Sequence, residues 1–193
     1  MKKTSSAQAI ISVKAQRILL KDTYRRKHIE ACGLLTGCID EGENWHIEMA
    51  HPLRNIYDSP VYFEFSPEDV LAIELDHPGQ IIGAYHSHPT GLSTASSTDR
   101  QNMKRVNLEQ QIPWVWLIIS GPFDESFASF RQERPRTRNG KGPLIIAYHH
   151  YKLLGLQQVS IQFAHPPAAS PGTLEQNHET IGHDGSHNET DAL

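Results

Sequence analysis

The stretch GQIIGAYHSHPTGLSTASSTD, residues 79–99, predicts a strand, a short loop and the start of a helix. Residues i and i+2 of a strand point to the same side, so His86 and His88 face one point at the end of an apolar strand. Pro89 ends the strand, and small residues lead to Ser96 and Asp99 at the first turn of a helix. The stretch therefore predicts that two imidazoles and a carboxylate converge where the strand ends and the helix begins.

This group of side chains has the composition of a catalytic metal site. Two histidines and one carboxylate provide three protein ligands, which leaves the fourth tetrahedral position of zinc for water, whereas a closed structural site uses four protein ligands. Zinc lowers the pKa of its water from 15.7 to about 7, which generates a nucleophile at neutral pH. We therefore predict that His86, His88 and Asp99 bind one Zn²⁺. The alternative is a strand end with surface histidines, because an isolated H-x-H is common.

Outward from this stretch, strands alternate with a few helices. Ser12 and Ser66 are typical N-caps, and Pro67 suits a first helical position. Apolar runs bounded by turn residues predict the strands. The predicted strands are 9–11, 29–39, 45–53, 79–88, 114–120, 126–133, 143–150 and 156–163, and the predicted helices are 13–26, one starting at 67, and about 96–107. This pattern predicts an α+β (mixed α/β) fold in one domain, residues 1–165.

The composition changes after this domain. Residues 166–193 contain Pro, Gly, Ser, Asn, His and Glu, with five acidic side chains and no lysine or arginine. Such a segment buries too little apolar surface to offset its ordering entropy, so we expect a disordered acidic tail.

Length, net charge and the number of cysteines limit the class of protein. The 193 residues carry a net charge of −4, which gives no indication of a nucleic-acid surface. The two cysteines, Cys32 and Cys38, lie too far apart on a strand for a disulfide, and we expect buried, unreactive thiols in a reducing compartment. No stretch approaches the roughly 18 apolar residues of a membrane helix. We therefore expect a cytoplasmic protein without membrane contact, and the oligomeric state stays open.

Three segments resemble one known family. The run HSHP, TGLSTA, Ser96, two residues and Asp99 resembles the JAMM motif of the MPN-domain (JAB-like) metalloproteases. HIEACGLLTG, residues 28–37, is similar to the family's E-x-C-G-L-L-x-G signature, which the related RadC-like proteins lack, and NIYDSPVYFEFSPEDV, residues 55–70, is similar to its Asn…Phe…Pro-Glu pattern. The resemblance covers residues 13–120. One departure is Ala95, where the family often has proline.

The resemblance implies a fold and roles for individual residues. The expected fold is a curved β-sheet flanked by two or three helices, with a cytidine-deaminase-like architecture. His86, His88 and Asp99 would bind zinc, Glu30 would accept a proton from water and pass it to the leaving amine, and Ser96 would hydrogen-bond the oxyanion or the water. A carboxylate cannot donate to an oxyanion, whereas a serine hydroxyl can.

The resemblance also implies a substrate. The family cleaves amide bonds after the C-terminal glycines of ubiquitin-like proteins, and short prokaryotic members are thought to trim ubiquitin-like sulfur carriers. We therefore expect a peptidase acting on such a carrier. Two alternatives remain: an isopeptidase that removes ubiquitin-like proteins from lysines, and a non-catalytic module that binds a ubiquitin-like tail.

Overall fold

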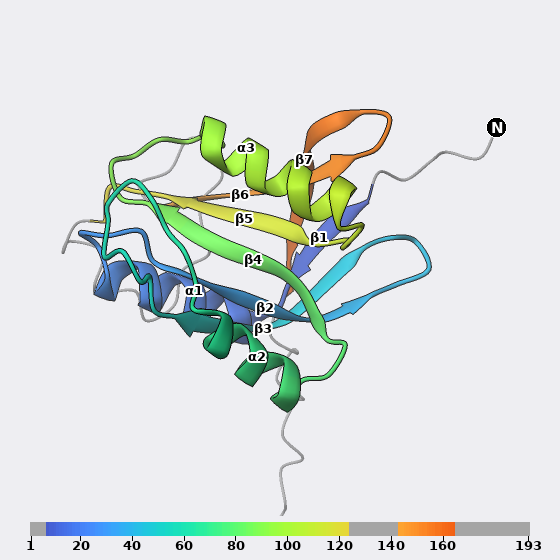
Figure 1. Ribbon diagram of the computed structural model, residues 1–193, viewed down its shortest axis with the longest axis horizontal. Coiled ribbons are helices and arrows are strands. Elements are labelled where there is room, and N and C mark those ends of the chain that lie inside the picture. Colours follow the sequence, from blue (N-terminus) through green and yellow to red (C-terminus); the bar gives the residue numbers. More distant parts are fainter. Residues whose placement is uncertain (1–6, 124–142, 165–193) are drawn as a thin grey trace, which may run out of the picture.

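The computed structural model describes residues 7–123 and 143–164 (Figure 1). Within them the strands are β1 (Gln8–Ile11), β2 (Cys32–Ile39), β3 (Trp45–Leu53), β4 (Ile81–His88), β5 (Val115–Ser120), β6 (Leu144–Tyr151) and β7 (Gly155–Phe163). The helices are α1 (Val13–Arg25), α2 (Pro67–Asp76) and α3 (Ser97–Lys104). The mixed α/β class and the number of helices are as predicted. The predicted strand 126–133 and the predicted acidic tail 166–193 lie outside the described residues.

The sheet closes into a barrel, which corrects the expectation of a curved sheet. The strand order is β1-β3-β2-β4-β5-β6-β7, and β1 pairs with both β3 and β7. In this register Ile10 lies between His46 of β3 and Gln162 of β7, and both pairings are parallel. A four-residue strand therefore joins the two ends of the sheet.

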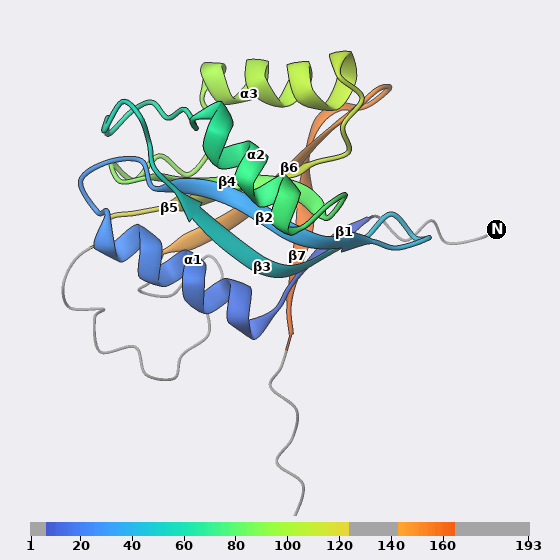
Figure 2. The same ribbon diagram turned by 60° about the horizontal axis from the view of Figure 1, so that its bottom comes forward.

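Helices cover both faces of the sheet, with α1 on one side and α2 and α3 on the other (Figure 2). Leu19 of α1 belongs to one core cluster with Tyr85 of β4. Met103 of α3 belongs to a second cluster with Ala84 of β4 and Trp116 of β5. Because neighbouring strand residues point to opposite faces, alternate residues of β4 from Ala84 onward lie on the side of α3, whereas Ile82 belongs to the first cluster. His86 and His88 continue this series.

The helix starts follow the capping residues in the sequence. The Ser12 side chain accepts a hydrogen bond from the Ala15 N–H, and the Ser66 side chain accepts one from the Asp69 N–H. Pro67 occupies the first turn of α2, where its missing N–H removes no helical hydrogen bond. These caps fix where α1 and α2 begin.

The third helix is shorter than predicted. It ends at Lys104, and a π-helical turn, Arg105–Glu109, follows. The Asn107 side chain donates to the carbonyls of Ile112 and Trp114, which draws the chain toward the start of β5. Local sequence patterns do not predict these contacts, because they join the end of the helical segment to the next strand.

Both cysteines are free thiols, as predicted, and Cys32 is buried. Cys38 is exposed, so the expectation that both thiols are buried is wrong, because Cys38 lies near the end of β2, beyond the part covered by the helices. Among the described residues, the helices are all too short or too polar to span a bilayer.

Candidate metal centre

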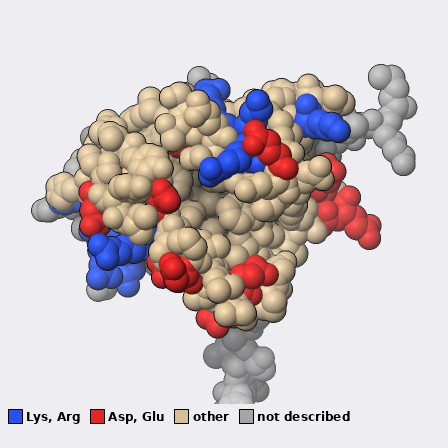
Figure 3. Space-filling view, viewed as in Figure 1, with Lys and Arg blue, Asp and Glu red and all other residues tan. Residues whose placement is uncertain are grey.

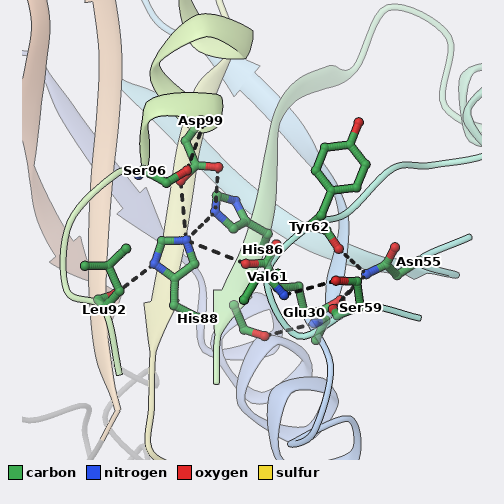
Figure 4. A network of polar contacts seen from close by, with 12 residues as sticks. Glu30, Asn55, Ser59, Val61, Tyr62, His86, His88, Leu92, Ser96 and Asp99 are labelled. Carbon is green, nitrogen blue, oxygen red and sulfur yellow. Dashed lines mark hydrogen bonds and ion pairs between the residues drawn. The ribbon is translucent and has the colours of Figure 1, made fainter. Parts of the chain in front are cut away.

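The two histidines at the end of β4 point to the same place (Figure 4). His86 and His88 are almost completely buried, and their Nε2 atoms lie 3.0 Å apart. β4 pairs with β2 on one side and with β5 on the other, so both imidazoles lie at the end of a strand that is hydrogen-bonded on both sides. The H-x-H spacing on the strand thus brings the Nε2 atoms of both histidines to one point.

Asp99 reaches the same point from the start of α3. Its Oδ1 lies 3.3 Å from His86 Nε2, and its Oδ2 lies 3.3 Å from His88 Nε2. A capping box orients this carboxylate: the Ser96 side chain accepts from the Asp99 N–H, and Asp99 Oδ2 accepts from the Ser96 N–H at 2.7 Å. The S-x-x-D spacing therefore builds the helix start and aims the acid at the imidazoles.

These three side chains could hold a divalent metal ion. Their ligand atoms all lie within 4.8 Å of one another, and the closest pairs are separated by 3.0–3.3 Å. Ligand atoms 2.0–2.1 Å from a tetrahedral zinc ion would lie about 3.3 Å from one another. The spacing and the donor set of two imidazoles and one carboxylate therefore fit zinc with one position left for another ligand.

At His86 and Asp99 the electrostatics of the metal-free site favour the protonation states that bind metals, whereas at His88 burial acts to lower the pKa but hydrogen bonds with Asp99 and Leu92 outweigh it and raise the pKa. Burial lowers the pKa of His86 and outweighs the opposing effect of Asp99. Burial acts to raise the pKa of Asp99, but hydrogen bonds from His86 and His88 hold this pKa well below its ordinary value. A neutral imidazole and an ionised carboxylate are the forms that coordinate a metal.

Neighbouring groups orient the two imidazoles. His88 Nδ1 donates to the Leu92 carbonyl at 2.8 Å, which leaves Nε2 to face Asp99. The Phe63 ring stacks on His86 with centroids 4.5 Å apart, while His86 Nδ1 is buried with no hydrogen-bond partner among the described residues. One ring is therefore fixed by a hydrogen bond and the other by packing.

Glu30 approaches the site from the connection between α1 and β2. Its Oε1 lies 3.9 Å from His88 Nε2, and the residue is 4% exposed. Burial raises the pKa of the Glu30 carboxyl to about 7, against a smaller lowering effect of His88. Sequence patterns place Glu30 within a strand, but β2 begins only at Cys32. This carboxyl can therefore exchange a proton near neutral pH in the metal-free protein.

Ser96 lies at the rim of the same site. Its hydroxyl accepts from the Asp99 N–H at 3.1 Å, and a hydroxyl that accepts one hydrogen bond can still donate another. The structure thus brings the five predicted site residues together, and their chemical roles stay predictions.

Three further residues make contacts near the site that the sequence patterns did not predict. Ser87, between the histidines, accepts from the Ala31 N–H with its hydroxyl and donates its own N–H to the Ala31 carbonyl. Asn55 and Phe63 lie in a long segment between β3 and α2 and reach Glu30 and His86, respectively. The signal in the sequence was the length of this segment, since long connections without helix or strand are often functional.

A narrow cleft leads to the site. Glu30, Tyr62 and Phe63 line one part of it, and Ser96 and Asp99 line another. Its volume of about 10 Å³ is close to what one water molecule needs. A larger hollow of about 490 Å³ lies beside α1 and holds none of the predicted site residues. The chemistry is therefore concentrated in the narrow cleft.

Comparisons with known proteins agree with this geometry. The family described as prokaryotic homologs of the JAB domain matches residues 12–134. A solution structure of a protein from Desulfitobacterium hafniense matches with a TM-score of 0.58 and 22% identity, over 90% of this chain and all of that one. This likeness supports the fold.

Three curated relatives match parts of the chain. A desampylase of Haloferax volcanii is 36% identical over 76 residues, or 37% of this chain and 52% of the relative. A desampylase of Pyrococcus furiosus is 33% identical over 95 residues, or 48% and 60%. Tail tip assembly protein K of Escherichia phage lambda is 41% identical over 56 residues, or 29% and 25%. The chain spans between a quarter and three fifths of the curated relatives it matches. Because the family match covers more than half of the sequence, the chain belongs to the prokaryotic homologs of the JAB domain.

Proposed function

We propose that this protein is a zinc-dependent peptidase that hydrolyses the amide bond after the C-terminal glycines of a ubiquitin-like protein. The observation that carries the proposal is the convergence of His86, His88 and Asp99, with Glu30 Oε1 at 3.9 Å from His88 Nε2. This arrangement combines three metal ligands with one carboxyl group that is free to move a proton.

Each side chain has a role in this reaction. A zinc ion held by His86, His88 and Asp99 would supply Lewis acidity and lower the pKa of the attacking water. Glu30 accepts a proton from this water and returns it to the leaving amine, as a general base and then a general acid. Ser96 donates its hydroxyl hydrogen to the oxygen that becomes negative during attack. Burial of the site strengthens these interactions because water is excluded.

Several features support a protein tail as the substrate. The cleft leaves no room for a bulky side chain beside the site, and paired glycines have none. Val61 and Tyr62, which line the cleft, and Leu92, whose carbonyl binds His88, expose apolar surface beside it. Exposed apolar groups around a site favour a protein partner. On the face in Figure 3, basic and acidic side chains form small separate clusters, which gives no indication of a polyanion as substrate.

We further propose a ubiquitin-like sulfur carrier with additional C-terminal residues as the substrate. The alternative reaction is removal of a ubiquitin-like protein from a lysine, which the names of the two desampylases favour. A second alternative is a module that binds such a tail without cleaving it. Residues 1–165 would form the catalytic domain and residues 166–193 a separate tail, a boundary that limited proteolysis of the chain can test.

The test is to incubate the zinc-loaded protein with linear carriers that end in Gly-Gly plus extra residues, and with carriers conjugated to lysine. Mass spectrometry would detect release of the extra residues or of the conjugated lysine. We expect cleavage of the linear substrates after the second glycine. Cleavage of the branched substrates alone would support the isopeptidase, and binding without any cleavage would overturn the peptidase.

A further inference from the structure

The segment that carries Glu30 is held by residues distant in sequence. The Glu30 N–H donates to the Ser59 carbonyl at 2.8 Å, and the Glu30 carbonyl accepts from Asn55 Nδ2 at 3.2 Å. On the other side, Ala31 forms two hydrogen bonds with Ser87 of β4. Both polar backbone groups of Glu30 thus bind the segment between β3 and α2, which we call the Asn55 segment (residues 55–64).

Asn55 is the centre of this segment (Figure 4). Its side-chain amide is completely buried and uses both ends. Nδ2 faces the carbonyls of Glu30, Ser59 and Tyr62 at 3.2, 3.5 and 2.8 Å. Oδ1 accepts from the N–H groups of Tyr57 at 3.2 Å and Glu64 at 3.4 Å. One side chain therefore folds the segment and ties it to Glu30.

Only an amide can make this set of contacts in the space available. An aspartate accepts from the two N–H groups but has no hydrogen for the three carbonyls. A serine is too short to reach both ends of the segment. Carbonyl groups left unpaired in a buried site cost about 1–3 kcal/mol each.

We propose that Asn55 is a positioning residue that holds the backbone of Glu30 so that its carboxylate faces His88 and Asp99. The effect on rate rests on the proposed peptidase function, whereas the effect on the backbone does not. The metal ligands come from β4 and α3 and none of them bonds to Asn55, so zinc should still bind when Asn55 is changed, although Phe63 of the same segment packs on His86.

The chain provides a matched control in Asn107. This second buried asparagine also donates to two carbonyls, those of Ile112 and Trp114. Its Oδ1 accepts from Trp116 Nε1 and from the His150 N–H. The hydrogen bonds of Asn107 are of the same kind as those of Asn55, and none of those described joins a predicted site residue.

The experiment compares Asn55→Asp with Asn107→Asp in the full chain. Both variants lose the donor half of the amide and keep the acceptor half. We expect amide hydrogen exchange of Glu30 to become at least tenfold faster in Asn55→Asp and to stay unchanged in Asn107→Asp. Asn107→Asp should keep the zinc affinity of the wild type, and Asn55→Asp should still be saturated at the zinc concentration used for turnover.

Turnover of the zinc-loaded protein provides the second readout. A misplacement of about 1 Å can cost roughly a hundredfold in rate, so we expect kcat of Asn55→Asp to fall about 10- to 100-fold. In the Glu30→Gln background, Asn55→Asp should cost less than about twofold, because a residue that acts through Glu30 has no further effect once Glu30 is changed. Equal losses in both backgrounds, or equal losses for Asn55→Asp and Asn107→Asp, would overturn the proposal.

A measurement on the wild type remains decisive even if the variants fail to fold. If Asn55 holds the segment and Glu30 as one unit, the amides of Tyr57, Glu64 and Glu30 exchange with the same opening free energy. Exchange of the Glu30 amide independent of the other two would contradict the proposal. A wild type that cleaves no carrier would overturn the peptidase function alone, since the exchange data still test the positioning.

Discussion

Glu30 combines burial with a position outside regular structure. The residue precedes β2 by two positions, and its carboxyl lies 3.9 Å from a predicted metal ligand. Glu30→Gln keeps the size of the side chain but cannot accept a proton. We expect zinc to stay bound while kcat falls by about 10²–10⁴-fold, the usual contribution of a general base.

The matched control for this variant is Glu64→Gln. Glu64 lies in the Asn55 segment but is exposed, and its carboxylate accepts from the Tyr62 hydroxyl. Metal analysis and steady-state kinetics of both variants provide the comparison. A normal kcat for Glu30→Gln, with zinc bound, would show that another group moves the proton.

The raised pKa of Glu30 predicts a pH effect on stability of the metal-free protein. Burial raises this pKa from 4.5 to about 7, so between these values the folded protein holds a proton that the unfolded chain releases. The free energy of unfolding therefore falls as pH rises through this range. Glu30→Gln removes this loss, so at pH 8 it should be more stable than the wild type by on the order of 1–3 kcal/mol.

Urea unfolding at pH 4 and pH 8 would check this sign. At pH 4 the wild-type carboxyl is protonated in both states, so the two proteins should have equal stability. A stability difference of the same size at both pH values would argue against burial of an ionisable Glu30.

The ligand residues predict a loss of metal-dependent stability. A ligand that binds only the folded state stabilises it by RT ln(1 + [L]/Kd), so zinc should raise the melting temperature of the wild type. His86→Ala and Asp99→Ala should abolish this increase, whereas His46→Ala, at a partly exposed position of β3, should keep it. Thermal melting with and without zinc provides the measurement, and an undiminished increase in Asp99→Ala would exclude Asp99 as a ligand.

At the scale of elements, β2 depends on a close approach at Gly33. A Cβ atom at this position would lie 2.2 Å from the His51 carbonyl oxygen and 2.5 Å from a ring carbon of Tyr85. Gly33→Ala should therefore destabilise the protein by about 1–3 kcal/mol, as overpacking does. Gly42→Ala, in an exposed turn, should cost much less, and denaturant unfolding would compare the two.

Local signals were sufficient to predict most helix starts and the convergence of the proposed metal ligands. Ser12, Ser66 and Ser96 cap their helices, and the spacing of His86 and His88 brings their rings together. The place of Glu30 could not be predicted in this way, because its backbone bonds join it to residues about 25 positions away. Only the resemblance to a family identified it as part of the site.

At the scale of the whole molecule, closure of the barrel depends on β1. Ile11 is completely buried in the core, whereas Ile10 is only partly buried. No local pattern indicates that such a short strand pairs with both β3 and β7, since these partners lie far apart in the sequence, at Trp45–Leu53 and Gly155–Phe163. The strand could therefore be predicted from the sequence, but the closure of the barrel could not.

This arrangement predicts different effects for two neighbouring isoleucines. Ile11→Ala should lower the free energy of unfolding by about 2–5 kcal/mol, as expected for a buried isoleucine. Ile10→Ala should cost clearly less because its side chain is partly solvated. Equal costs in chemical denaturation would mean that β1 contributes little to the closed sheet.

The carboxylate of Asp99 accepts the Ser96 N–H with the same oxygen that lies 3.3 Å from His88 Nε2. The start of a helix and the proposed metal site thus depend on the same oxygen atom. Substitution at Asp99 therefore has to meet two requirements. A replacement able to coordinate a metal ion would also have to accept the Ser96 N–H, so that the first turn of α3 still forms.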